Sequence, residues 1–197
     1  MPEKMPGNRR RIYEGRIVAL EVATVSMPDG SLLEMECVRH PGGAAVVAVD
    51  ETGRVCLLRQ YRPVLDAWCW ELPAGKIDHD EPPLNTARRE LAEEAAVEAA
   101  VWHELGGIVS SPGVFDERIH LYLATKLKAV TVPQEKGEFF ERHWLPFVDV
   151  LAWTLDGRLA DAKSIAALHR AAHHEALPPL ARGKLAREKM AGEDQAR

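Results

Sequence analysis

Residues 75–97 read GKIDHDEPPLNTARRELAEEAAV, and this stretch decides how the chain is interpreted. From about Pro82 to Ala95 its apolar residues recur at helical spacing, with Leu84, Ala87 and Leu91 on one side. Proline is well placed in the first turn of a helix, because the amide that it lacks has no partner inside the helix there. The stretch therefore predicts one amphipathic helix.

Three carboxylates lie on one face of this predicted helix. At 100° per residue, Glu90, Glu93 and Glu94 share an arc of about 100° at the margin of the packed face. Like charges this close cost about 0.2 to 0.5 kcal/mol per pair even in water, so a compensating positive charge is expected. Hard divalent cations such as Mg²⁺ prefer oxygen ligands and bind to one or two carboxylates together with phosphates. The alternative is an ordinary solvated helix face, on which glutamate is a favoured residue.

Strand patterns precede the helix. Residues 12–38 predict an antiparallel hairpin that turns at Pro28-Asp29-Gly30. Residues 44–49 and 54–59 flank a second turn and are apolar enough to form a hairpin at the centre of a covered sheet. Arg9, Arg10 and Arg11 are expected in a solvated arm.

Shorter patterns follow the helix, and Pro178-Pro179 is expected to close the domain before a solvated tail. The predicted strands are residues 104–109, 119–128 and 142–145, and the predicted helices are residues 147–155 and 162–176.

Composition excludes several classes of protein. The 197 residues (21.9 kDa) suit one domain, and a net charge of −5 with pI near 5.9 disfavours bulk binding to nucleic acid. The chain has three cysteines, Cys37, Cys56 and Cys69, which cannot all form disulfides within it. We therefore expect reduced thiols and a cytoplasmic protein. Neither a secretion signal nor a membrane span is expected, because no apolar run approaches 18 residues.

The spacing of the polar residues resembles the Nudix box. Eight of the nine specified positions of this box match. Gly75 is followed after five residues by Glu81, and after seven more by the run Arg89-Glu90-Leu91-Ala92-Glu93-Glu94-Ala95-Ala96-Val97. The departure is Ala96, where the family has glycine. Either Ala96 adopts the left-handed turn at a cost of about 1 to 2 kcal/mol, or the helix continues through Ala99.

The resemblance extends over residues 12–167. Four segments resemble the ADP-ribose pyrophosphatase branch of the Nudix hydrolases. They are Arg59-Gln60-Tyr61-Arg62, ELPAGKID at 71–78, Ser111-Pro112-Gly113 and Asp116-Glu117. This implies an α/β/α sandwich around a mixed sheet, with an N-terminal antiparallel hairpin. The implied organisation is an arm at 1–11, a Nudix domain at 12–177 and a tail at 178–197.

The same resemblance implies roles for individual residues. The metal ligands would be Glu90, Glu94 and the Ala74 carbonyl, and the ion would be Mg²⁺ or Mn²⁺. Glu93 would be either a further ligand or the residue that orients the attacking water. Glu138 is the candidate general base or additional ligand. Arg62, Glu71, Trp70 and Ser111 would contact substrate, and Gly75, Glu81 and Arg89 would support the cluster. Alternatives for three of these are a surface cation (Arg62), core packing (Trp70) and a strand neighbour (Glu71).

The implied activity is metal-dependent hydrolysis of ADP-ribose, or of a related nucleoside diphosphate sugar, to AMP and ribose 5-phosphate. A homodimer with contacts through residues 12–38 is implied as well. Two alternatives remain open at this point. One is a catalytically silent nucleotide-sugar-binding regulator; the other is a Nudix hydrolase of GDP-sugars, dinucleoside polyphosphates or coenzyme A.

Overall fold

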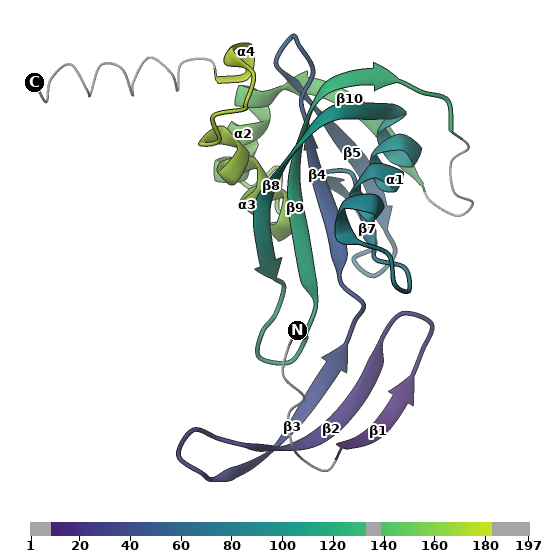
Figure 1. Ribbon diagram of the computed structural model, residues 1–197, viewed down its shortest axis with the longest axis vertical. Helices are drawn as coiled ribbons and strands as arrows, with labels where there is room; N and C mark the ends of the chain where they lie inside the picture. Colours follow the sequence, from purple (N-terminus) through teal and green to yellow (C-terminus); the bar gives the residue numbers. More distant parts are fainter. Residues whose placement is uncertain (1–8, 133–138, 183–197) are drawn as a thin grey trace, which may run out of the picture.

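A computed structural model describes residues 9–132 and 139–182 of the chain, which form three sheets and four helices (Figure 1). In chain order the elements are β1 (Arg9–Glu14), β2 (Ala19–Ser26), β3 (Leu32–Arg39), β4 (Gly43–Ala48), β5 (Arg54–Arg62), β6 (Ala67–Glu71), β7 (Ala74–Lys76), α1 (Pro83–Ala95), β8 (Val97–Val109), β9 (Arg118–Ala129), β10 (Phe140–Pro146), α2 (Phe147–Asp156), α3 (Ala162–Ala172) and α4 (Pro179–Arg182).

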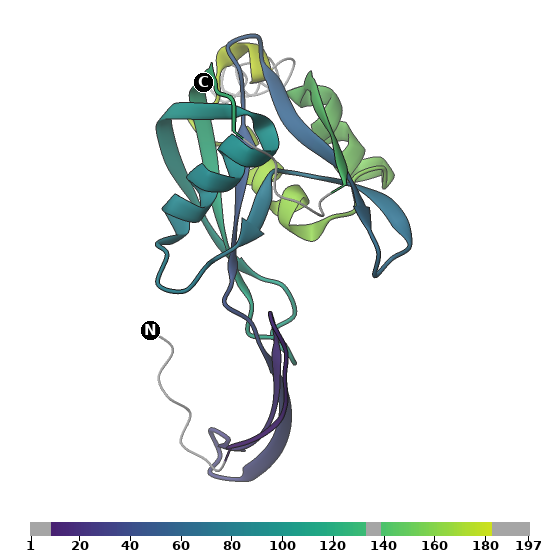
Figure 2. The ribbon, with the colours of Figure 1, turned by 90° about the vertical axis from the view of Figure 1, so that its right-hand side faces the viewer.

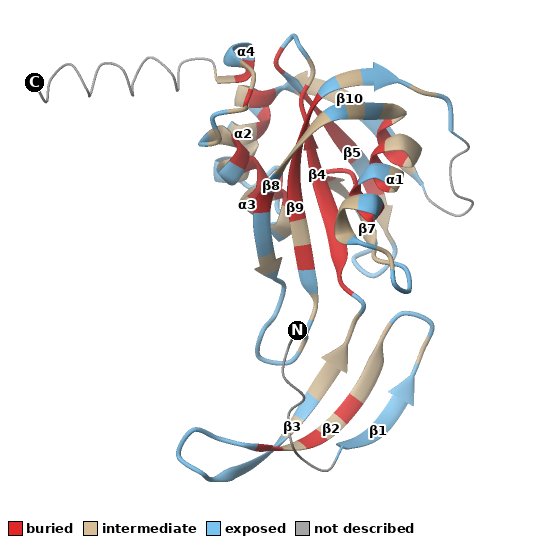
Figure 3. Cartoon of the chain, in the orientation of Figure 1, coloured by how far each residue is buried: buried red, intermediate tan, exposed pale blue. Residues whose placement is uncertain are grey.

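The central sheet is mixed and has helices on both faces. Its order is β7-β4-β9-β8, with β4 parallel to β9 and the other pairs antiparallel. Alternate residues of β4 enter different cores: Val46 packs with Leu91 of α1, and Val47 packs with Leu168 of α3. Because both faces are covered, every residue of β4 is buried (Figure 3). The predicted α/β/α sandwich is confirmed.

The second sheet, β10-β5-β6, shows that the predicted central hairpin is wrong. Strands β4 and β5 follow one another across a turn but are joined only by an isolated bridge between Val49 and Val55. Both strands are deeply buried, and each takes two other partners: β4 pairs with β7 and β9, and β5 with β6 and β10. The short strands β6 and β7 were not predicted, because neither carries a clear alternating pattern.

The N-terminal sheet, β1-β2-β3, lies at one end of the molecule (Figures 1 and 2), and the end of β3 contacts the loop after β8 through a bridge between Val38 and Phe115. The predicted hairpin is present as β2 and β3, and Gly30 takes the positive φ of 82° that its turn requires. The arginines expected in a solvated arm instead belong to β1, where Arg11 contacts Glu14 and Glu21 at 2.9 and 3.0 Å. These three residues are exposed, as expected, but they belong to a strand.

The C-terminal helices pack on the central and second sheets. Helix α3 ends at Ala172, earlier than predicted, and the chain then turns into α4. Leu177 and Ala181 are in the core, so packing extends past the proline pair that was expected to close the domain. No helix within residues 9–132 and 139–182 has the length and apolar character needed to cross a membrane.

Helix α1 ends at the position where the sequence departs from the Nudix box. Ala96 has φ 52° and ψ 39°, which is the left-handed conformation, and β8 begins at Val97. The helix therefore stops without glycine, and the alternative of a helix through Ala99 is wrong. Strand β8 also starts seven residues earlier than predicted, since residues 97–103 pair with β9.

Replacing Ala96 by glycine should stabilise the protein. The change relieves the clash between an L side chain and its own backbone, and we expect the free energy of unfolding to rise by about 1 kcal/mol. Urea denaturation measures this. The matched control is Ala92→Gly, inside α1, which should lower stability by about 1 kcal/mol. A destabilised Ala96→Gly variant would contradict the assignment of strain to this residue.

Candidate active site

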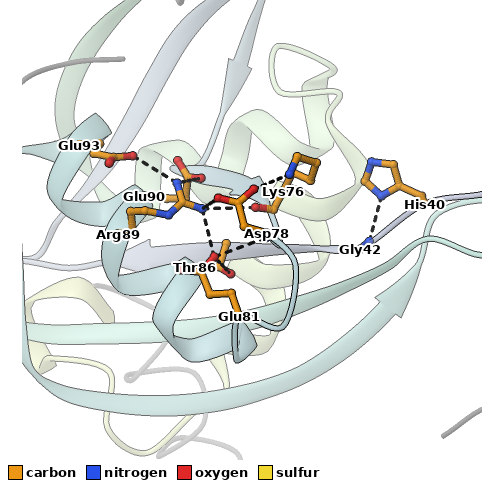
Figure 4. A network of polar contacts seen from close by, with 9 residues as sticks. All are labelled: His40, Gly42, Lys76, Asp78, Glu81, Thr86, Arg89, Glu90 and Glu93. Carbon is orange, nitrogen blue, oxygen red and sulfur yellow. Dashed lines mark hydrogen bonds and ion pairs between the residues drawn. The ribbon is translucent and has the colours of Figure 1, made fainter. Parts of the chain in front are cut away.

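The polar residues of the Nudix-box pattern meet around Arg89 (Figure 4). Its Nη1 donates to Glu90 Oε1 at 2.7 Å and to Glu93 Oε2 at 3.3 Å. Its Nη2 donates at 3.3 Å to Glu81 Oε2 and to the carbonyl oxygen of Lys76. One guanidinium thus links the turn before α1 to two carboxylates on the helix. This is the compensating charge that the carboxylate pattern required.

Electrostatics in this cluster favour the charged forms. Burial alone would lower the pKa of Arg89, but hydrogen bonds and the charges of Glu81 and Glu90 outweigh it and raise that pKa. Burial alone would raise the pKa of Glu81, yet hydrogen bonds from Arg89 and from the Thr86 hydroxyl at 2.8 Å lower it. The Glu81 carboxylate is consequently held ionised as an acceptor.

Gly75 allows α1 to approach β7 closely. A Cβ atom added to Gly75 would lie 1.8 Å from Oε1 of Glu90. The glycine is therefore needed for the space that the Glu90 carboxylate occupies. The sequence predicts that these carboxylates lie at the margin of the packed face. Glu90 is buried more deeply than that prediction, because it is only 7% exposed.

Glu94 is buried more deeply, with 2% exposure, and its Oε2 accepts a hydrogen bond from the amide of Ala74 at 2.8 Å. The neighbouring Pro73 carbonyl accepts from the amide of Val46 at 2.9 Å. These two bonds attach the chain before β7 to α1 on one side and to β4 on the other. The backbone of Ala74 is thus placed next to the helix carboxylates.

The donor chemistry of this cluster fits a hard divalent cation. Glu90, Glu93, Glu94 and the Ala74 carbonyl offer only oxygen atoms, which Mg²⁺ and Mn²⁺ accept. Within the described part of the chain, no three His, Cys, Asp or Glu side chains already stand in an arrangement that could hold an ion. A cation bound here would share Glu90 and Glu93 with Arg89.

A second charged cluster surrounds Glu71. Its two oxygens accept from Arg62 Nε and Nη2, both at 2.6 Å, and Oε2 also accepts from Lys163 Nζ at 2.5 Å. The structure thus brings Arg62 and Glu71 together, as a bidentate pair. Lys163, at the start of α3, was not predicted; it is 92 residues away in sequence, and no local pattern connects it to Glu71.

The pKa of Glu71 is strongly shifted. Burial alone would raise it, but the hydrogen bond from Arg62 and the charge of Lys163 prevail and lower it to about 2. Arg62 keeps a 40% exposed side chain. Its hydrogen bond to Glu71 raises its pKa against the opposing effect of burial, and the charges of Glu71 and Glu94 contribute in the same direction as the hydrogen bond. The Glu71 cluster therefore lies within electrostatic reach of the helix carboxylates.

The remaining predicted substrate residues lie elsewhere. Trp70 stacks edge-on against His143 at 4.9 Å and tilts against Trp153 at 5.2 Å. Ser111 is exposed in the loop after β8, where its carbonyl accepts from the amides of Val114 and Phe115. Glu138 lies outside the described residues.

Glu71→Gln should change how stability depends on pH. The carboxylate has a pKa of about 2 in the folded protein against 4.5 ordinarily, so its contribution is complete above about pH 4.5 and disappears as pH falls toward 2. We expect the variant to be about 3 kcal/mol less stable at pH 7, with the gap narrowing through that window. Urea denaturation from pH 7 to 3 measures both.

The matched control for this pH series is Glu34→Gln, at an exposed position of β3. It should leave the free energy of unfolding nearly unchanged throughout. A stability gap for Glu71→Gln that stays constant with pH would show that the ion pairs of Glu71 do not carry the effect.

Comparison with known proteins identifies the family. A family model described as NUDIX domain matches residues 39–168. Two ADP-ribose pyrophosphatases are similar: that of Mycobacterium tuberculosis is 36% identical over 160 residues (80% of this chain, 77% of that protein), and that of Bacillus subtilis is 35% identical over 177 residues (86% and 92%). A methanol dehydrogenase activator from Bacillus methanolicus is 36% identical over 169 residues (85% and 91%).

The fold is shared as well. A crystal structure of an ADP compounds hydrolase superposes with a TM-score of 0.71 and 20% sequence identity, covering 85% of this chain and 92% of the other. The family model covers the central sheet and both charged clusters, including Lys163. The chain therefore belongs to the NUDIX domain family.

Proposed function

We propose that this protein is a metal-dependent pyrophosphatase that hydrolyses ADP-ribose to AMP and ribose 5-phosphate. The observation that carries the proposal is the Arg89-centred cluster, in which Glu90 and Glu93 meet beside the Ala74 backbone that Glu94 holds. Relatives in two bacteria bear the name ADP-ribose pyrophosphatase. Together these favour diphosphate hydrolysis over the other reactions open to the fold.

Nudix proteins generally use a divalent metal ion, and we assign Mg²⁺ here, with Mn²⁺ as a substitute. The ligands would be Glu90, Glu94, Glu93 and the Ala74 carbonyl. When bound, such an ion polarises phosphoryl oxygens and makes a nearby water more acidic. Arg89 orients the carboxylates of Glu90 and Glu93 by hydrogen bonds, and Gly75 leaves the space that the Glu90 carboxylate needs.

The other side chains would bind substrate and water. Glu93 has a 24% exposed side chain, against 9% for Glu90, and is therefore the carboxylate best placed to orient the attacking water. Arg62 donates hydrogen bonds from Nε and Nη2 to Glu71. Its remaining nitrogen, Nη1, would donate to a diphosphate oxygen. Trp70 and Ser111 are further proposed substrate contacts, and Glu138 is the proposed general base.

Incubation with ADP-ribose and Mg²⁺ tests the proposal, with products resolved by ion-exchange chromatography. We expect AMP and ribose 5-phosphate, and no cleavage in the presence of a chelator. Glu93→Gln and Glu94→Gln should each lower the rate by at least about a hundredfold while the protein stays folded, because each removes a charge that the reaction needs. Glu98→Gln, an exposed glutamate just beyond α1, is the control and should keep the wild-type rate.

Three results would overturn this assignment, each in a different way. Wild-type rates in both glutamine variants would remove the carboxylates from the chemistry. Cleavage of other nucleoside diphosphate derivatives, but not of ADP-ribose, would retain the reaction and change the substrate. Calorimetric binding of ADP-ribose without any product would favour a silent regulatory module, the alternative left open by the sequence.

We also propose that the protein is a homodimer with contacts through its N-terminal sheet. Several large apolar side chains are exposed there: Ile12, Tyr13, Ile17, Leu32 and Leu33. Exposed apolar side chains of this size on a sheet at the end of the molecule favour an interface (Figure 3).

Light scattering of the purified protein tests the dimer. We expect twice the chain mass for the wild type and a shift toward monomer for Leu33→Lys, because a buried lysine in the interface would lose its hydration. Leu155→Lys is the control: this leucine is 80% exposed on α2, outside the N-terminal sheet, and its replacement should leave the mass unchanged. A monomeric wild type would refute the proposal.

The cysteines support the cytoplasmic location that we propose. Cys37, Cys56 and Cys69 are all free, and burial raises the pKa of the Cys56 thiol to about 12. A buried thiol of this kind is unreactive, and free cysteines are usual where thiols stay reduced.

A further inference from the structure

Residues 71–74 run from the end of β6 to the start of β7, and each is anchored to another element; Glu71 is held by β5 as well as by α3. Two of the anchors belong to the site: the Pro73 carbonyl accepts from β4, and the Ala74 amide donates to Glu94 of α1. The other two, at Glu71 and Leu72, reach the opposite side of the central sheet. There both contact the first turn of α3.

The contact at Leu72 is a buried hydrogen bond to a serine. The amide of Leu72 donates to Oγ of Ser164 at 2.8 Å, and Ser164 is fully buried. The hydroxyl in turn donates to Oδ2 of Asp161 at 2.5 Å. Because its single hydrogen goes to Asp161, the hydroxyl must present a lone pair to Leu72. Asp161 therefore determines the orientation in which Ser164 holds the backbone.

The contact at Glu71 is ionic and uses the same carboxylate of α3. Lys163 Nζ lies 2.5 Å from Oε2 of Glu71 and 3.0 Å from Oδ2 of Asp161. Asp161 also accepts from the amide of Ser164 at 3.1 Å, which makes it the N-cap of α3. One helix start thus holds two consecutive residues of the segment, one by its side chain and the other by its backbone.

We propose that Asp161, Lys163 and Ser164 are positioning residues for the metal site on the other side of the sheet. They hold Glu71 and Leu72, and through them set where the Ala74 carbonyl and its partner Glu94 lie. This inference rests on the proposed function, because it takes the Ala74 carbonyl and Glu94 as ligands. None of the three α3 residues contacts the carboxylate cluster directly in the hydrogen bonds and ion pairs described.

The physical reason is that residues 72 and 74 are only two positions apart. Ser164→Ala would leave the buried Leu72 amide without an acceptor, and the backbone would move to find one. Any such movement is transmitted to Ala74, whose amide holds Glu94. Partners that orient metal ligands without touching the metal commonly change affinity by 10- to 100-fold when removed.

Direct Mn²⁺ binding to the substrate-free, full-length protein tests the inference. In an electron paramagnetic resonance titration we expect Ser164→Ala to raise the dissociation constant about tenfold with unchanged stoichiometry. Ser164→Thr, which keeps the hydroxyl, should restore most of the affinity. In the activity assay the Mg²⁺ concentration for half-maximal rate should rise in parallel, whereas kcat at saturating Mg²⁺ should change little.

A matched control separates positioning from general destabilisation. Thr154→Ala removes a partly buried hydroxyl, which donates to the carbonyl of Leu151 within α2 and makes no described hydrogen bond to residues 71–74. It should bind Mn²⁺ as the wild type does. A variant that is merely less stable would lose binding sites as it unfolds, and would not lower the affinity of the sites that remain. Should Ser164→Ala fail to fold, Lys163→Met tests the Glu71 anchor with the same expected direction.

Two outcomes would overturn the inference, and they are distinguishable. If the wild type binds Mn²⁺ and the folded Ser164→Ala protein, or Lys163→Met in its place, binds it equally well, α3 does not position the site. If the wild type itself binds no Mn²⁺ and does not cleave ADP-ribose, the proposed function fails and the inference fails with it.

Discussion

Arg89 places one guanidinium among Glu81, Glu90 and Glu93, and the arrangement of the site depends on this neutralisation. Carboxylates on adjacent turns of a helix repel one another, and partial burial increases the cost. With Arg89 between them, the same residues become hydrogen-bond acceptors that join the turn before α1 to the helix. Gly75 then lets this charged face lie directly against β7.

The chain uses the same principle on the other side of β7. Glu71 is more than nine-tenths buried and is balanced by Arg62 and Lys163, so its charge links β5, β6 and α3. A buried carboxylate with two cations is costly to disrupt, because any one lost partner leaves a charge unpaired. The two charged clusters therefore hold residues 71–76 from both faces of the central sheet, in addition to the pairing of β7 with β4.

The edge of the central sheet is protected by a separate device. Strand β8 is an edge strand, and such strands expose backbone groups to other chains. Arg170 of α3 donates to the carbonyls of Leu105 and Gly107, and the pairing with β9 shifts register between Glu104 and Gly106. A bulge and an arginine thus protect part of this edge, and neither involves the residues of the candidate site.

Local patterns were sufficient for the elements whose partners are close in sequence. Helix α1 was predicted from the spacing of Leu84, Ala87 and Leu91, and the β2–β3 hairpin from its Pro-Asp-Gly turn. The prediction that β4 and β5 form a hairpin was wrong, because adjacency along the chain does not determine which sheet a buried strand joins. The partnership of Glu71 with Lys163 could not be predicted either, because 92 residues separate them and neither lies in a spacing pattern that points to the other.

What the sequence determined by itself is the helix, its row of carboxylates and the family, since all three depend on residues within a few turns of one another. Tertiary structure decided how far each carboxylate is buried, which cation balances it and how the backbone of Ala74 is held. It also decided that Ala96 keeps the left-handed turn without glycine, because pairing of β8 with β9 from Val97 onward outweighs the local strain. Charge balance and strand pairing are set by contacts in space, which spacing along the chain does not encode.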